Sequence, residues 1–236
     1  MLLGELIQRV QSLYSKGVQS QSTRLRNRHI YNKLLTVRAK LISQEVKRKQ
    51  KLSPQNFQTL FCVELIEVPT HECPCIPPVG CNIIRSKHKL PKFLSGLNGH
   101  IIQSVTNIDN SVKLDEITLN AVKHLKGNKY TSNKNNYFIH NGYLYLTEYT
   151  KMRVVNLTAL FEDPISILTF ENYCNGDYSN TGDNKCIDYL NMEFPIDLDM
   201  IDVLIEFSLQ ELIQVFANNV EDLTNNNSDN IKQNSK

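Results

Sequence analysis

Long apolar runs are absent from this sequence of 236 residues. No stretch approaches the roughly eighteen consecutive apolar residues that a membrane-spanning helix needs. At the N-terminus, Leu2 and Leu3 are followed at once by Glu5 and Arg9, so no apolar signal region forms. We therefore expect neither a membrane span nor a secretion signal. Without export, we expect the six cysteines to be reduced thiols.

Motifs of the common enzyme classes are missing as well. The sequence holds no GxSxG nucleophile turn, no phosphate-binding glycine loop and no HExxH metal motif. Paired acids such as Glu162-Asp163 are explained by turns and helix caps. The histidines recur in no catalytic pattern; they are His29, His71, His88, His100, His124 and His140. We therefore expect no enzyme, and no catalytic, cofactor-binding or metal site.

Charge of one sign is scarce at each end of the chain. Residues 1–51 hold twelve Lys and Arg against two acids, Glu5 and Glu45. Between Glu193 and Asp229 there are nine acids and no Lys or Arg. The net charge of only +2 gives no global case for a nucleic-acid partner, so the distribution is the informative feature. We expect the basic and acidic ends to meet, within a subunit or between neighbouring subunits of an oligomer.

The strongest feature that is present is a basic amphipathic segment, Thr23–Leu52. We predict a helix here, capped by Ser22 or Thr23 and ended by Pro54. Burying its apolar stripe does not offset the entropy of ordering about thirty residues, so this helix needs a partner surface. The stripe recurs at helical spacing and comprises Ile30, Leu34, Leu35, Val37, Leu41, Ile42 and Val46. The other faces carry the bases, which are Arg24, Arg26, Arg28, Lys33, Arg38, Lys40, Lys47, Arg48, Lys49 and Lys51.

Two more helices are predicted near the ends of the chain. The first runs from Met1 to about Lys16, and the last runs from about Leu198 to Val220, just after Pro195. The fold class we expect is α+β in one domain over residues 1–225. Its helical frame would comprise 1–53 and 193–225, its β-rich insertion 54–192, and residues 226–236 would be a disordered tail.

Alternating apolar and polar residues predict the strands of the insertion. The clearest signal is the hairpin Tyr137–Thr150, because Asn141-Gly142 lies between two alternating runs. We also predict a short helix over Asp115–Leu125, with Asp115 as its cap and Gly127 as its stop. The other strands are expected at residues 56–68, 82–85, 100–105, 112–114 and 153–160.

Two loops hold residues of the kinds that bind metals. His71, Cys73, Cys75 and Cys81 could hold zinc, or the loop could be a proline-built turn with small buried thiols. The spacing is not that of two separated ligand pairs, which favours the turn. Asp177–Gly182 with Asp188 is similar in spacing to a calcium-binding loop, although a simple turn explains it better. Cys174 and Cys186 flank this second loop, and nothing in the sequence pairs them.

The basic helix has two functional interpretations. Arg24, Arg26, Arg28 and Lys47–Lys51 could bind phosphates of a nucleic acid. Aromatic side chains that stack on bases are missing, apart from Tyr31. Docking against protein is therefore favoured over nucleic-acid binding.

Several stretches together are similar to one family. They are FQTLFCVELIEVP, ECPCIPPVGCNIIRSKHKLPKFL, TALFEDP and EFPIDLDMIDVLIEFSLQELI. These resemble virion proteins of crAss-like, short-tailed bacteriophages, specifically the ring, or adaptor-like, proteins of the head-to-tail connector. The resemblance covers most of residues 20–215.

The resemblance implies a structural protein that forms a homo-oligomeric ring of twelve copies. Such a ring would join the portal protein to the tail around the DNA exit channel. Its partners would be itself, the portal and the adjacent connector or tail rings, with at most non-specific contact with packaged DNA and no membrane. It would lie in the virion, after assembly in the host cytoplasm. The alternatives are a basic nucleic-acid-binding accessory protein and a small zinc-stabilised binding module, and residues 69–81 and 171–186 could be contact arms.

Overall fold

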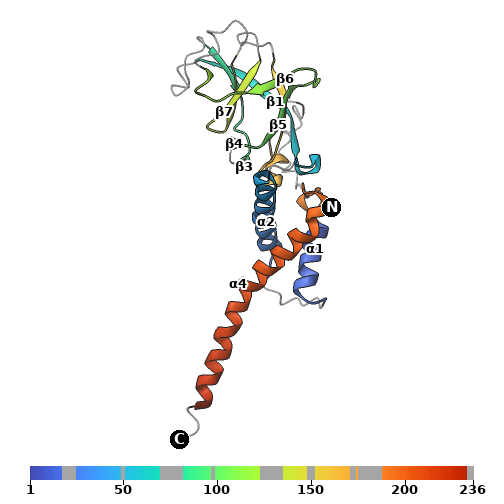
Figure 1. Cartoon of the computed structure of the whole chain (residues 1–236), viewed down its shortest axis with the longest axis vertical. Helices are drawn as coiled ribbons and strands as arrows, with labels where there is room; N and C mark the ends of the chain where they lie inside the picture. The colour runs from blue at the N-terminus through green and yellow to red at the C-terminus, as the bar shows by residue number, and fades with distance from the viewer. Residues whose placement is uncertain are drawn as a thin grey trace, which may run out of the picture. The chain divides into compact units, whose positions relative to one another are not determined.

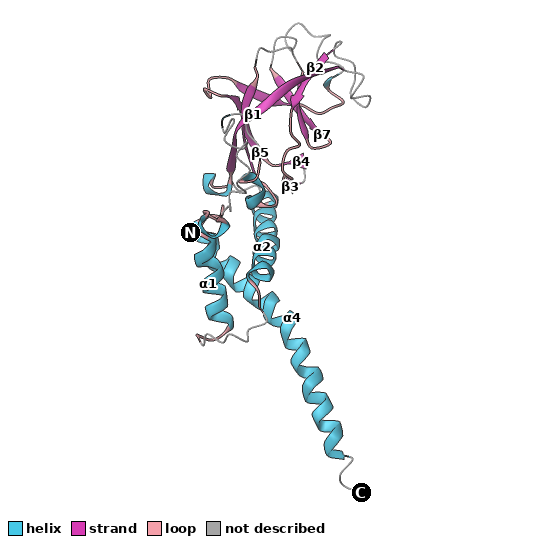
Figure 2. Ribbon diagram, turned by 180° about the vertical axis from the view of Figure 1, so that it is seen from behind, coloured by secondary structure: helices cyan, strands magenta, loops and turns pink. Residues whose placement is uncertain are grey.

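The chain divides into two compact units in a computed structural model (Figures 1 and 2). The helical unit comprises Met1–Ser53 and Asp188–Lys236, and the barrel unit comprises Pro54–Ile187. The fold is α+β, as predicted. The structure describes residues 1–17, 25–48, 51–69, 82–96, 99–122, 135–147, 152–170, 174 and 188–232, and from residue 216 onward the backbone alone.

The described residues of the helical unit form three α-helices. They are α1 (Leu3–Tyr14), α2 (Asn27–Lys47) and α4 (Leu198–Lys232), and a short 3-10 turn, η6 (Tyr189–Asn191), precedes α4. Both α1 and α2 pack against α4, and the C-terminal part of α4 extends past them (Figures 1 and 2). The three helices expected from the apolar spacing are therefore confirmed, with differences at their ends.

The ends of α2 and α4 differ from the prediction. Helix α2 begins at Asn27 with Arg26 as its N-cap, so the expected cap at Ser22 or Thr23 is wrong. Within the helix the first buried residue is Ile30, and Leu25, which precedes the cap, is buried without being helical. At its other end α2 stops at Lys47, well before Pro54. Helix α4 continues to Lys232, so residues 226–232, which we expected in a disordered tail, are helical. No proline or glycine follows residue 198 to break a helix already begun.

The N-terminus of α1 is tied to the segment before α4. The Leu3 N–H donates to the Met192 carbonyl at 2.9 Å, and the Phe194 N–H donates to the Met1 carbonyl at 3.1 Å. The Glu5 carboxylate accepts from the Leu2 N–H at 3.1 Å and so satisfies a free donor at the helix start. Backbone hydrogen bonds thus join the N-terminal segment of the chain to the segment that leads into α4.

The barrel unit is a closed seven-stranded barrel with the neighbour order β1-β2-β8-β7-β6-β5-β9. Its neighbouring strands pair antiparallel, except β6 and β7, which are parallel. A separate two-stranded sheet joins β3 (Ser95–Gly96) to β4 (Gly99–His100). The barrel strands are β1 (Gln58–Pro69), β2 (Asn82–Ser86), β5 (Ile102–Asn107), β6 (Lys113–Glu116), β7 (Asn136–His140), β8 (Tyr143–Leu146) and β9 (Val154–Ala159).

The long strand β1 closes the barrel. Its first half pairs with β9, from Gln58 to Glu64, and its second half pairs with β2, from Leu65 to Pro69. A bulge lies between Leu60 and Val63, where the pairing with β9 changes register. Such a bulge bends a strand and increases its twist, which lets one strand serve both sides of a small barrel.

The predicted hairpin is confirmed as β7 and β8. Asn141 and Gly142 form the turn with φ of 52° and 81°. Two successive residues with positive φ are typical of the tight turns that match the twist of paired strands. The register runs from His140 opposite Tyr143 to Tyr137 opposite Leu146.

The predicted helix over Asp115–Leu125 is wrong for residues 115–121, whereas Val122 is helical. Asp115 and Glu116 belong to β6 and pair with Asn136 and Tyr137 of β7. Leu114 lies buried in the barrel core. Pairing with β5 and β7 therefore outweighs the local capping signal of Asp115, and residues 123–134 lie outside the described residues.

Side chains fill the barrel interior. Val105, Leu144, Val155, Leu157 and Phe161 are fully buried there. A second cluster lies on the other face of β2, β7 and β8, where Ile83, Phe138 and Tyr145 are buried together with Val122. The alternation of the strands thus serves two apolar surfaces, one inside the barrel and one outside it.

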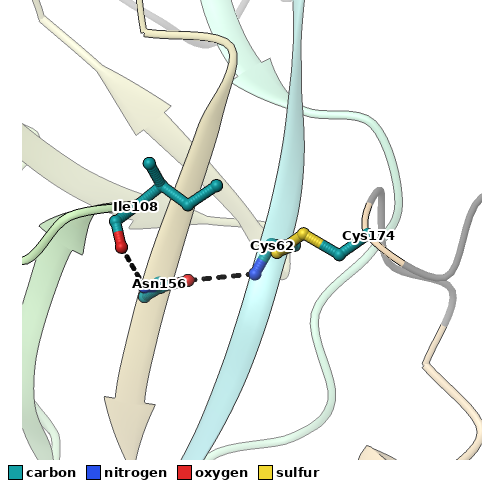
Figure 3. The surroundings of a disulfide bond; sticks show 4 residues. All are labelled: Cys62, Ile108, Asn156 and Cys174. Atoms are coloured by element: carbon teal, nitrogen blue, oxygen red, sulfur yellow. Dashed lines mark hydrogen bonds between the residues drawn. A yellow bond between two sulfur atoms is a disulfide. The ribbon is translucent and has the colours of Figure 1, made fainter.

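A disulfide joins the bulge of β1 to the segment after β9 (Figure 3). Cys62, with φ of 56°, is bonded to Cys174, 112 residues later in the sequence. The Cys62 N–H donates to the Asn156 side-chain oxygen at 3.0 Å, and the Asn156 amide donates to the Ile108 carbonyl at 3.3 Å. The expectation of reduced thiols is therefore wrong for these two cysteines. The pair could not be seen in the sequence because only the fold brings their Cα atoms to 5.6 Å.

Candidate assembly interface

The basic helix α2 and the acidic helix α4 meet within one chain. The two helices are in contact, and each buries an apolar stripe. On α2 the buried apolar residues are Ile30, Leu34, Val37, Leu41 and Ile42, and on α4 they are Ile201, Leu204, Ile205 and Leu212. The predicted partner surface of the basic helix is therefore the C-terminal helix of the same chain.

Glu211 of α4 links two lysines of α2. Lys33 Nζ lies 2.8 Å from one carboxylate oxygen, and Lys40 Nζ lies 2.5 Å from the other. Hydrogen bonds from these two lysines lower the pKa of Glu211 below its ordinary value. One carboxylate that accepts from two side chains fixes the register of the two helices more firmly than a single exposed pair would.

Arg38 lies in the interior of the helical unit. Its side chain is only 1% exposed, its Nε donates to the Pro195 carbonyl at 2.8 Å, and its guanidinium lies 5.8 Å from the centre of the Phe194 ring. Burial lowers the pKa of Arg38 to about 10, so the group is still protonated at neutral pH. The prediction that Arg38 lies on the basic outer faces of the helix is therefore wrong. Its spacing of four residues from Leu34 and three from Leu41 could have placed it on the buried stripe.

An ion pair also joins α1 to α4. Arg9 and Asp202 approach to 3.0 Å, but their side chains are 53% and 82% exposed. Water and salt screen such a pair, so it contributes little to stability.

Large apolar side chains remain exposed on α4. Val203 and Phe207 are 39% and 41% exposed, and Ile213 is 47% exposed. The neighbouring acids Asp199 and Glu206 are exposed too. Soluble proteins do expose single apolar residues, but several on one helix face, rimmed by charge, mark a surface for docking. We call the surface formed by Asp199, Val203, Glu206, Phe207, Gln210 and Ile213 the outer face of α4.

The candidate metal sites receive no support from the described residues. His71, Cys73, Cys75 and Cys81 lie outside them, as do Asp177–Gly182 and Cys186. Asp188 caps η6 by accepting from the Leu190 N–H at 3.2 Å. Within the described part of the chain, no group of three His, Cys, Asp or Glu residues could hold a metal ion. None of the helices described there has the length and apolar character to cross a membrane.

Comparison with known protein families gives a match. The model of a family described as phage tail ring protein 2 matches residues 5–231, which span both the helical unit and the barrel unit. A search of curated proteins finds no match. Because the family model covers nearly the whole sequence, this chain belongs to the phage tail ring protein 2 family of crAss-like phages.

Proposed function

We propose that twelve copies of this chain form a ring in the phage head-to-tail connector, between the portal protein and the tail. The match to a tail ring family over residues 5–231 carries this proposal. A structural role in the virion tail follows from the family itself. The ring size, the portal contact and the position around the DNA channel are the parts that we add.

An adaptor-like organisation is part of the proposal. Met1–Ser53 and Asp188–Lys236 form the helical unit, while the barrel unit is inserted between them. We propose that the helical unit builds the body of the ring as one adaptor-like domain over residues 1–225. The inserted barrel would then present loops to the portal or to an adjacent ring. The helix–β–helix order of the chain supports this assignment of the ring body to the helical unit and of the outward contacts to the barrel unit.

No chemistry is needed for this role. We propose that the chain is not an enzyme and has neither a catalytic residue nor a cofactor, and the match to a tail ring family supports this proposal. Assembly would take place in the host cytoplasm before the ring joins the virion. Self-association is the activity that an experiment has to detect.

Electron microscopy of the purified protein tests the proposal. We expect closed rings with a central opening, and we expect them to persist when salt is raised, because apolar burial is screened far less than charge. Particles of monomer size at every protein concentration and salt concentration would contradict it.

The exposed bases of α2 support the second candidate, nucleic-acid binding. Arg28 and Lys47 are exposed near the two ends of the helix, and Arg48 is 67% exposed although it pairs with Glu45. A monomer that binds duplex DNA, with an affinity that falls steeply as salt is added, would favour this function. A ring with only weak, non-specific DNA affinity would favour the connector.

A further inference from the structure

A closed ring needs two different surfaces on every subunit, because each copy must contact a neighbour on either side head to tail. The identity of these two surfaces rests on the proposed ring. Internal packing uses one face of each helix, so the faces that remain outside are the candidates. We propose that the outer face of α4 docks on the outer face of α2 of the next copy.

The outer face of α4 offers an apolar centre with an acidic rim. At about 100° per residue, Val203 lies on the side of the helix opposite the buried Leu212, and Phe207 lies one turn further along. Gln210 donates to Glu206 at 3.4 Å, so these two polar side chains lie together beside the apolar pair. Covering two or three such side chains removes apolar surface from water and so favours association.

The outer face of α2 is basic, and the side chains in its middle are short. We define it as Arg28, Asn32, Thr36, Ala39, Ser43 and Lys47. Asn32 and Thr36 are exposed, and the Thr36 hydroxyl donates to the Asn32 carbonyl at 2.9 Å, so it is satisfied by its own helix. Short side chains in the middle of this face let another helix approach closely, and Arg28 and Lys47 supply positive charge toward its ends.

Charge complementarity selects a second copy and fixes how it docks. Two outer faces of α4 would bring Asp199 and Glu206 against the same acids, and two outer faces of α2 would bring bases together. Contact between unlike faces pairs acids with bases around an apolar centre. Contacts between like faces are therefore disfavoured, and the favoured contact between unlike faces is of the kind that closes a ring when it is repeated head to tail.

Charge reversal in the full-length chain tests this contact. The variant D199K/E206K makes the outer face of α4 basic, and the variant R28E/K47E makes the outer face of α2 acidic. We expect neither variant to form rings alone, because each then presents two faces of the same sign. An equimolar mixture of the two is expected to assemble again, because every contact in an alternating ring joins opposite charges. Mass photometry and electron microscopy measure the outcome, and circular dichroism checks that each variant is folded.

The apolar centre is tested by F207S, with L13S as the matched control. Leu13 is 49% exposed on α1 and lies outside both faces, so its loss should leave assembly unchanged. We expect F207S to raise the concentration needed for half-assembly roughly tenfold or more, as for a central interface residue. If F207S and both charge variants form rings as well as the wild type does, the proposed interface is wrong, but the proposal that the chain forms a ring is supported. If the wild type stays monomeric, the proposed ring and this interface both fail.

Discussion

At the scale of single residues, two charged side chains hold the helical unit in different ways. Arg38 is buried and its Nε donates to the Pro195 carbonyl, whereas Glu211 lies near the surface and accepts from two lysines. A buried guanidinium loses hydration, which is why its pKa falls to about 10. The carboxylate gains partners instead, which is why its pKa falls below the ordinary value.

Arg38→Ala should destabilise the protein by about 2–4 kcal/mol, because it leaves a cavity and an unpaired Pro195 carbonyl. Arg38→Met should cost less, because it keeps most of the volume and removes the cost of burying a charge. Urea denaturation of both variants measures the difference. Equal stability of the wild type and R38A would show that Arg38 is not buried as described.

Glu211→Gln tests the bridge to Lys33 and Lys40. A carboxylate whose pKa is lowered by folding adds stability that is fully present above its unfolded pKa, near 4.5, and is lost as the pH falls through the folded value. We therefore expect E211Q to be less stable than the wild type at pH 7, by roughly 0.5–1 kcal/mol, and the gap to close in acid. A gap that does not change between pH 7 and acid would contradict the bridge. Thermal unfolding at a series of pH values provides the measurement.

At the scale of elements, helices and strands differ in how far their sequence determines them. Each of the three helices carries an apolar stripe within itself, so its existence could be predicted from residue spacing. Strand β6 could not be predicted from residue spacing, because the pairing of Asp115 with Asn136 depends on a segment twenty-one residues away. A local capping signal favours a helix, but the pairing of a strand that completes a barrel determines the structure here.

The disulfide is the firmest link between two elements of the barrel unit. Replacing both cysteines, in C62S/C174S, should lower the free energy of unfolding by about 2–4 kcal/mol, because the bond closes a long loop in the unfolded chain. The wild type under reducing conditions is the matched control and should lose a similar amount. Peptide mapping without reductant should find the two cysteines in one linked peptide. Free Cys62 in the unreduced, unfolded protein would contradict the bond.

At the scale of the whole molecule, the order helix–β–helix and the charge asymmetry of the two ends could be predicted. The asymmetry is explained in part within the chain, where Lys33 and Lys40 pair with Glu211. The closure of the barrel through β1 and the pairing of Cys62 with Cys174 could not be predicted, because both join residues that only the fold brings together. The apolar side chains of α4 divide into a buried face, which includes Leu204 and Leu212, and an exposed face, which includes Val203 and Phe207. The sequence pattern alone does not show which apolar side chains pack inside the chain, because a docking surface for another protein is apolar too.

Native mass spectrometry of the purified wild-type chain tests the central claim, ring assembly, most directly. A ring of twelve copies of the 27.1 kDa chain should give one assembly of about 325 kDa, with no ladder of intermediate sizes at saturating concentration. A single species at the mass of one chain, over the whole concentration range, would contradict the account.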